Sequence, residues 1–222
     1  MAVMIDPKVG RPLGYVLCIV AAALAGPSVS SGQTPDRALS FGCHEPFDSR
    51  LSMADLSERF GPEVVASRAI YLGEGVTQKG AVLFPESVNE VEILWNDTEQ
   101  QRGPSNIRIR KPGSRWTTKE GLALGKRLNQ VERLNDKPFR LLGFGWDAGG
   151  TVMSWASGRL AATAVDDCRL RVRFGYLSNA VSAQIDRKVD GSAEFSSADP
   201  AMQRINPAIT EMWLEFSRTL RK

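Results

Sequence analysis

Apolar and polar positions alternate in short runs along the chain from about residue 50 onward. Leu56 and Phe60 share one face of a predicted short helix, with Asp55 in its first turn. Ser52 can cap this helix, and Gly61, followed by a proline, ends it. After the helix, extended segments are predicted at residues 64–71 and 80–84, separated by a Gly-rich turn. Period-two alternation predicts further strands at residues 91–95 and 106–110.

The second half of the chain repeats this order. Four apolar residues form one helical stripe, namely Leu124, Leu128, Val131 and Leu134. Thr117 and Glu120 form a capping-box pattern before the stripe. Two glycines weaken the first turns that would follow, so the alternative is a helix that begins only near Lys126. Asn135 and Pro138 end the helix in either case.

Strands are predicted again after the second helix, at residues 139–146, 151–155, 159–165 and 168–174. Residues 196–207 contain two prolines and indicate a loop, and residues 209–216 fit a closing strand, with a short amphipathic helix as the alternative. This order predicts an α+β protein, mainly an antiparallel sheet with two short helices. The halves, residues 48–112 and 113–222, are consistent with a tandem repeat of helix and meander, although they share little residue identity.

Residues 1–25 are expected to be a cleaved signal peptide. Lys8 and Arg11 precede an uncharged apolar run at residues 13–25. This run of about a dozen residues is shorter than the roughly 20 that a membrane-spanning helix needs. It ends in an Ala-Leu-Ala pattern that signal peptidase accepts. An uncleaved membrane anchor is the alternative.

Export decides how the remaining sequence is interpreted. Residues 26–47 are rich in Ser, Pro and Gly and are expected to be flexible, whereas residues 48–222 are expected to form a globular αβ domain. Cys43 and Cys168 survive cleavage and favour a disulfide in an oxidising compartment, the alternative being two unpaired buried thiols. We therefore expect a periplasmic or secreted protein without an integral membrane span after cleavage. The formal net charge of +3, with no Lys/Arg run, does not favour nucleic acid as a partner.

Three short segments resemble the repeating unit of small bacterial envelope modules, namely residues 125–131 (GKRLNQV), 134–138 (LNDKP) and 144–146 (FGW). BamE-like assembly lipoproteins and the β-lactamase-inhibitor-protein fold use a similar helix-plus-sheet unit, the latter in tandem. Residues 143–155 are also similar to a segment of an uncharacterised exported bacterial family. These resemblances imply a fold and a compartment, and they assign no functional residue.

No segment of the sequence matches a catalytic or cofactor-binding motif. His44 is the single histidine, which leaves no His-ligated metal cluster and no Ser–His pair. Residues 143–150 (GFGWDAGG) lack the Lys-Ser/Thr of a phosphate loop and are predicted to form a strand–turn–strand around Trp146. We therefore assign no catalytic residue, metal or cofactor. Asp147 is the candidate residue for an alternative function, a carboxylate-dependent hydrolase.

Arginines alternate with apolar residues on two of the predicted strands. Arg169, Arg171 and Arg173 would face one side of the sheet, and Arg108 and Arg110 show the same pattern on another strand. If the two strands are near each other, five guanidinium groups share one surface that suits carboxylates or phosphates. The alternative is a solvated face whose arginines pair with carboxylates across strands, namely Glu92, Glu194 or Glu211.

These features favour a non-enzymatic binding module that presents a sheet face to an acidic protein surface or an anionic ligand. An inhibitor of an exported hydrolase is a specific version of this hypothesis. We expect the tryptophans to lie mainly in the core, with one or two exposed at strand ends as binding anchors; they are Trp95, Trp116, Trp146, Trp155 and Trp213.

Overall fold

The first helix begins and ends where its local sequence dictates. The computed structural model of the chain describes residues 39–44, 46–165, 167–176 and 187–217. Helix α1 spans Met53–Phe60 and starts with a reciprocal capping box, in which the Asp55 N–H donates to Ser52 Oγ and the Ser52 N–H donates to the Asp55 carboxylate at 2.8 Å. Gly61, with φ 97°, ends the helix, so the prediction for this segment is confirmed.

The described residues belong to one compact unit, Arg37–Lys222. The predicted signal peptide, residues 1–25, lies outside the described residues. No helix in the described part of the chain has the length and apolar character that a bilayer span requires.

Four consecutive strands form an antiparallel meander after α1 and the short 3-10 helix η1 (Pro62–Val64). They are β1 (Val65–Gly73), β2 (Val76–Leu83), β3 (Val91–Asp97) and β4 (Arg102–Ile109). All four strands were predicted, and each is longer than its sequence pattern indicated. Glu74 and Gly75, both at positive φ, form the turn between β1 and β2.

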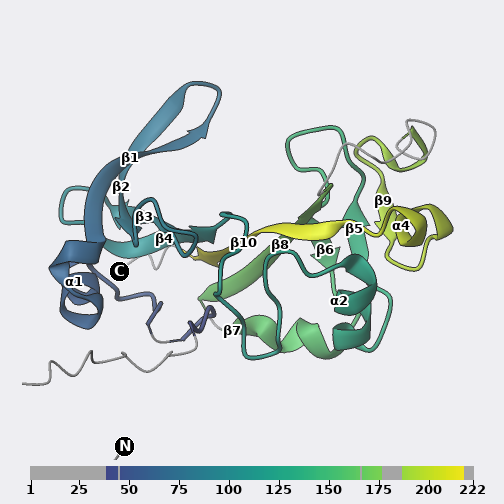
Figure 1. Cartoon of the computed structure of the whole chain (residues 1–222), viewed down its shortest axis with the longest axis horizontal. Helices are drawn as coiled ribbons and strands as arrows, with labels where there is room; N and C mark the ends of the chain where they lie inside the picture. Colours follow the sequence, from purple (N-terminus) through teal and green to yellow (C-terminus); the bar gives the residue numbers. More distant parts are fainter. Residues whose placement is uncertain (1–38, 45, 166, 177–186, 218–222) are drawn as a thin grey trace, which may run out of the picture. The chain divides into compact units, whose positions relative to one another are not determined.

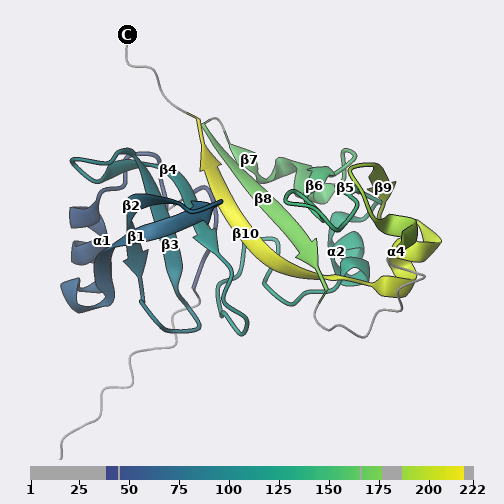
Figure 2. The same ribbon diagram turned by 90° about the horizontal axis from the view of Figure 1, so that it is seen from above.

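The large sheet joins strands from both halves of the chain. Its order is β1-β2-β3-β4-β10-β8-β7, so the closing strand β10 (Ala208–Phe216) pairs with β4 on one side and with β8 (Cys168–Gly175) on the other (Figure 2). Residues 209–216 are therefore a strand, and the helical alternative is wrong. Strand β7 is the short edge strand Ala164–Val165.

A second sheet has the order β6-β5-β9. Its strands are β5 (Arg140–Leu142), β6 (Val152–Ser154) and β9 (Glu194–Ser196). The first half of the chain thus has the expected helix and meander, whereas the second half divides its strands between two sheets. The protein is α+β with mainly antiparallel sheets, as predicted, but the meander itself does not recur.

Three sequence predictions in the second half need correction. Helix α2 is Leu128–Asn135 and starts after Arg127, so Thr117 and Glu120 do not cap it. Thr117 instead pairs with the segment around Ser40. Its N–H donates a hydrogen bond to the carbonyl oxygen of Leu39, and its carbonyl oxygen accepts one from the Phe41 N–H. The strand predicted at residues 159–165 is mostly the 3-10 helix η2 (Arg159–Thr163), and the loop at residues 196–207 contains helix α4 (Pro200–Ile205), which the Asp199 side chain caps.

The end of the segment predicted to be flexible is packed into the core. Phe41 and Phe47 are fully buried and lie against each other and against Trp116, with ring centroids 5.3–6.4 Å apart. The burial of these aromatic side chains offsets the cost of ordering a polar segment. Cys43, between them, forms the predicted disulfide with Cys168 at the start of β8, with Cα atoms 5.7 Å apart.

Candidate binding face

Strand β8 sorts its side chains as the alternation predicted. Leu170, Val172 and Phe174 are buried on one side of the strand. Arg169, Arg171 and Arg173 lie on the other side, where Arg169 is exposed and the other two are partly exposed. The alternation therefore places the three arginines together on one face of β8.

The strand order brings the two groups of arginines to one face. Trp213 on β10 is directly opposite Arg108 on β4 and Arg171 on β8, so the three residues form one row across the sheet. Arg110 follows β4, one alternation beyond Arg108. We call this surface of β3, β4, β10 and β8 the arginine face. Its members are Glu92, Arg108, Arg110, Arg169, Arg171, Arg173, Glu211, Trp213 and Glu215.

Carboxylates neutralise much of the arginine face. The Glu92 carboxylate forms ion pairs with Arg108 and Arg110, each with an N···O distance of 2.7 Å, and the Glu92 side chain is only 13% exposed. Glu211 lies 3.1 Å from Arg173 and 3.6 Å from Arg108. The cross-strand pairing expected for Glu92 and Glu211 is therefore present, whereas Glu194 pairs with Arg140 in the small sheet. The face is a lattice of alternating charges and not a continuous basic patch.

The β8 end of the arginine face is the least neutralised. Glu215 faces Arg169 in the register, yet its nearest recorded arginine atom is Arg171 Nε, at 3.8 Å. That Nε is buried and makes no hydrogen bond to any described residue. No carboxylate among the described residues pairs with Arg169. Glu215 therefore offsets the charge of Arg171 alone, and the exposed guanidinium group of Arg169 is available to an external anion.

Trp213 is the aromatic centre of the arginine face. Its ring lies under the guanidinium group of Arg173, 5.6 Å from centroid to Cζ. Trp95 and Trp116 are core residues, as predicted for most of the tryptophans. Trp146 is 44% exposed at the β5–β6 turn, and Trp155 is partly buried against Phe139.

The β1–β2 hairpin projects beyond the rest of the large sheet (Figure 1). Strand β2 pairs with β3 only over Gly80–Leu83, so residues 69–79 form a two-stranded arm. Tyr71, Leu72 and Val76 on this arm are 52%, 43% and 55% exposed. Arg108 donates a hydrogen bond to the carbonyl oxygen of Tyr71 at 3.3 Å, which connects the arm to the arginine face. Sequence reasoning missed the arm, because its residues fit an ordinary strand pattern.

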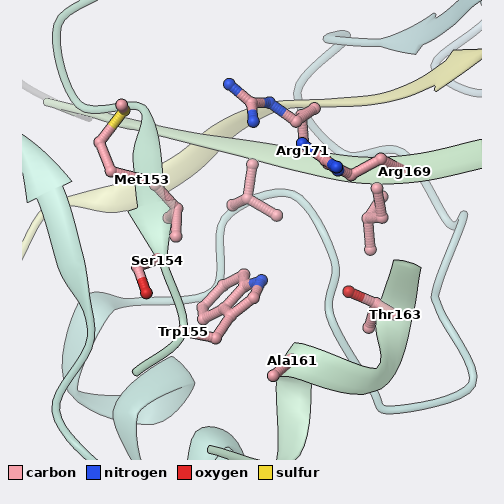
Figure 3. A pocket seen from close by; sticks show the side chains of 10 residues that line it. Met153, Ser154, Trp155, Ala161, Thr163, Arg169 and Arg171 are labelled. Atoms are coloured by element: carbon pink, nitrogen blue, oxygen red, sulfur yellow. The ribbon is translucent and has the colours of Figure 1, made fainter. Parts of the chain in front are cut away.

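A pocket of about 280 Å³ opens at the edge of β8, beside the arginine face. It is lined by Val152, Met153, Ser154, Trp155, Ala161, Thr163, Arg169, Leu170, Arg171 and Val172. Figure 3 shows Arg171 above the strand and Arg169 along it, with Trp155, Ala161 and Thr163 below it. The lining thus combines an apolar floor (Trp155, Leu170 and Val172), two hydroxyl side chains and a cationic rim (Arg169 and Arg171).

The other candidate residues from the sequence form no catalytic group. Asp147 is exposed in the turn between β5 and β6, as the strand–turn–strand interpretation of residues 143–150 predicts. His44 is exposed beside the disulfide. Among the described residues, no three His, Cys, Asp or Glu side chains are close enough to hold a metal ion.

Among the described residues, two carboxyl groups have a perturbed pKa, and both have structural roles. Hydrogen bonds from the Ser52 hydroxyl and then from the Ser52 N–H lower the pKa of Asp55. A hydrogen bond from the Gln100 N–H is the main cause that lowers the pKa of Asp97, with Arg102 contributing. These groups stabilise a helix start and a turn.

Comparison of this chain with protein-family models, curated proteins and solved structures finds no match.

Proposed function

We propose that this protein is an exported, non-enzymatic binding module that holds a protein partner against the arginine face. The observation that carries the proposal is the row Arg108–Trp213–Arg171, a partly exposed tryptophan with an arginine on each side. Tryptophan and arginine are the residues most enriched at the energetic centres of protein interfaces. Export is part of the proposal and is supported by the N-terminal sequence and by the Cys43–Cys168 disulfide.

The pairing within the face favours a protein surface over a simple anion. Glu92 and Glu211 already form ion pairs with Arg108 and Arg173. Such a lattice matches a partner that carries both charges in a complementary arrangement, with excess acidic groups opposite Arg169 and Arg171. The exposed apolar side chains of the arm supply contact area that a small anion would not use.

Inhibition of an exported hydrolase is the version of this proposal that the arm favours, because a projecting hairpin with apolar side chains can enter a cleft. The carboxylate-dependent hydrolase is not favoured by any specific observation, since Asp147 is exposed in its turn.

The test is affinity capture from envelope extract, followed by binding measurements with the captured protein after purification. The variants are Trp213→Ala, the triple change of Arg169, Arg171 and Arg173 to Ser, and Tyr71→Ser with Leu72→Ser. The control triple changes Arg133, Arg187 and Arg204 to Ser, which removes the same charge from exposed positions outside the large sheet.

The proposal expects the control to bind like the wild type, and each face or arm variant to lose at least about tenfold in affinity. Equal losses in the control and the face triple would mean that only net charge matters. Such a result would refute a binding role for the face.

A further inference from the structure

The pocket at the edge of β8 is a gap in the pairing of the large sheet. On this edge, β7 pairs with β8 as far as Arg169. The next residue of β8 with a partner on this edge is Arg173, which forms an isolated bridge with Thr151. Between these points, the described residues provide no strand partner for Leu170–Val172. The side chains of β6 and η2 surround the gap without filling it, which leaves the volume of about 280 Å³.

One part of the pocket wall is apolar and preformed. Leu170 and Val172 are buried core residues of β8, and Trp155 is fixed by its ring contact with Phe139, 5.2 Å between centroids. Met153, 45% exposed, gives the mouth a flexible thioether that can adapt to a ligand. A rigid apolar floor with one adaptable wall is typical of small-molecule sites.

Polar donors occur at two levels of the pocket. Arg169 and Arg171 are at the rim, where Glu215 pairs with Arg171 and no described carboxylate pairs with Arg169, so the rim keeps a positive balance. The indole Nε1 of Trp155 makes no hydrogen bond to any described residue, and its edge faces the Thr163 side of the pocket (Figure 3). A ligand in the pocket would thus meet cations at one end and an aromatic wall at the other.

We propose that this pocket binds a small organic carboxylate with a compact apolar body. The carboxylate would accept hydrogen bonds from the guanidinium groups of Arg169 and Arg171, and the apolar body would lie on Trp155, Leu170 and Val172. The volume is just below the usual range for drug-sized ligands, so a ligand with a single ring fits best. This inference goes beyond the proposed function and does not depend on a protein partner.

The experiment uses the purified chain and two probes that differ only in charge, 3-phenylpropionate and its neutral amide, 3-phenylpropanamide. Binding is measured by calorimetry and by the shift of the Trp155 indole N–H signal in ¹H–¹⁵N spectra, which the Trp155→Phe variant identifies. N-acetyl-phenylalanine is a third probe, since it presents the same carboxylate as the end of a polypeptide chain does.

Two kinds of variant test the two ends of the pocket. Arg169→Gln with Arg171→Gln removes the cationic rim, and Arg133→Gln with Arg204→Gln is the control of equal charge. Ala161→Phe introduces a bulky ring into the pocket lining from an exposed position. Thermal unfolding of each variant checks that it folds.

We expect 3-phenylpropionate to bind and to shift the Trp155 signal, with at least about tenfold weaker binding of the amide and of the rim variant. Ala161→Phe should abolish the shift, and the control should not change it. A preference for N-acetyl-phenylalanine would assign the site to chain ends, and a preference for 3-phenylpropionate would assign it to free acids.

Equal binding of acid and amide, or full binding in a folded Ala161→Phe variant, would overturn the proposal. The ligand-binding measurements use no partner protein. Failure of the affinity capture would therefore count against the proposed function and would leave the test of the pocket unchanged.

Discussion

Gly150 joins the small sheet to β8 at a point where no other residue fits. It is buried and has φ +75°, and a Cβ at this position would lie 2.0 Å from the carbonyl oxygen of Phe174. The Gly150 carbonyl accepts a hydrogen bond from the Phe174 N–H at 2.9 Å. Gly150→Ala would therefore force β6 and β8 apart by more than an ångström.

Three effects should lower the free energy of unfolding of the Gly150→Ala variant. Holding alanine at positive φ costs about 1–2 kcal/mol. Forcing a methyl group into a packed site costs about 1–3 kcal/mol, and loss of the Phe174 hydrogen bond costs about 0.5–1.5 kcal/mol. Because relaxation of one strain relieves part of the others, we expect the free energy of unfolding to fall by about 3–5 kcal/mol.

Gly145→Ala is the matched control for urea unfolding with the disulfide intact. Gly145 belongs to the same turn and has φ +83°, but a Cβ there would meet nothing closer than Asp190 Oδ1, at 3.6 Å. This variant should lose only the backbone part, about 1–2 kcal/mol. Equal losses in the two variants would refute the close approach of Gly150 to β8.

Three further predictions concern the helix cap, the disulfide and the arginine face. Ser52→Ala should lower the free energy of unfolding by about 1 kcal/mol at neutral pH. The pKa of Asp55 is lower in the folded protein than its unfolded value of 3.8, so this carboxylate contributes its full stability above pH 3.8 and loses it as the pH falls through the folded pKa. The difference in free energy of unfolding between wild type and Ser52→Ala, measured by urea titration, should therefore become smaller in acid. A difference that stays constant with pH would contradict the capping box. Reduction of the Cys43–Cys168 bond, which spans 125 residues, should destabilise the fold by about 4–5 kcal/mol, to be read from denaturation with and without dithiothreitol; an unchanged midpoint would show that the bond does not constrain the unfolded chain. Glu92→Gln removes the carboxylate shared by Arg108 and Arg110 and should lower the free energy of unfolding by about 1–3 kcal/mol in thermal or urea unfolding. A neutral outcome would show that the charge lattice adds no stability.

Capping residues and apolar–polar alternation in the sequence correctly predicted α1 and β8. The cap at Ser52 and the glycine at position 61 define α1 completely. The alternation at residues 168–174 predicted both faces of β8, because side-chain direction in a strand depends only on position. The 3-10 helix η2 was missed, since a short run of small and apolar residues fits either structure.

The candidate site could be predicted only in part, because it depends on strand order. The five arginines share a face only because β10 lies between β4 and β8, and no local pattern specifies this neighbour. For the same reason, the contact of Glu215 with Arg171 was not expected. The pocket combines β6, η2 and β8, which are separate in sequence, so its existence is a tertiary property.

The position of β10 has a consequence for the order of folding. Its pairs with β4 connect residues about 100 positions apart, as Leu214 with Ile107 and Met212 with Ile109. Until β10 is available, β4 and β8 each have an unpaired edge, and no strand connects the β1–β4 meander to the β8–β7 pair. Such long-range pairing makes folding slow, since the loop must close before the contacts can form. The large sheet can therefore assemble only after residue 216 has been made, and until then its edges are open to other chains.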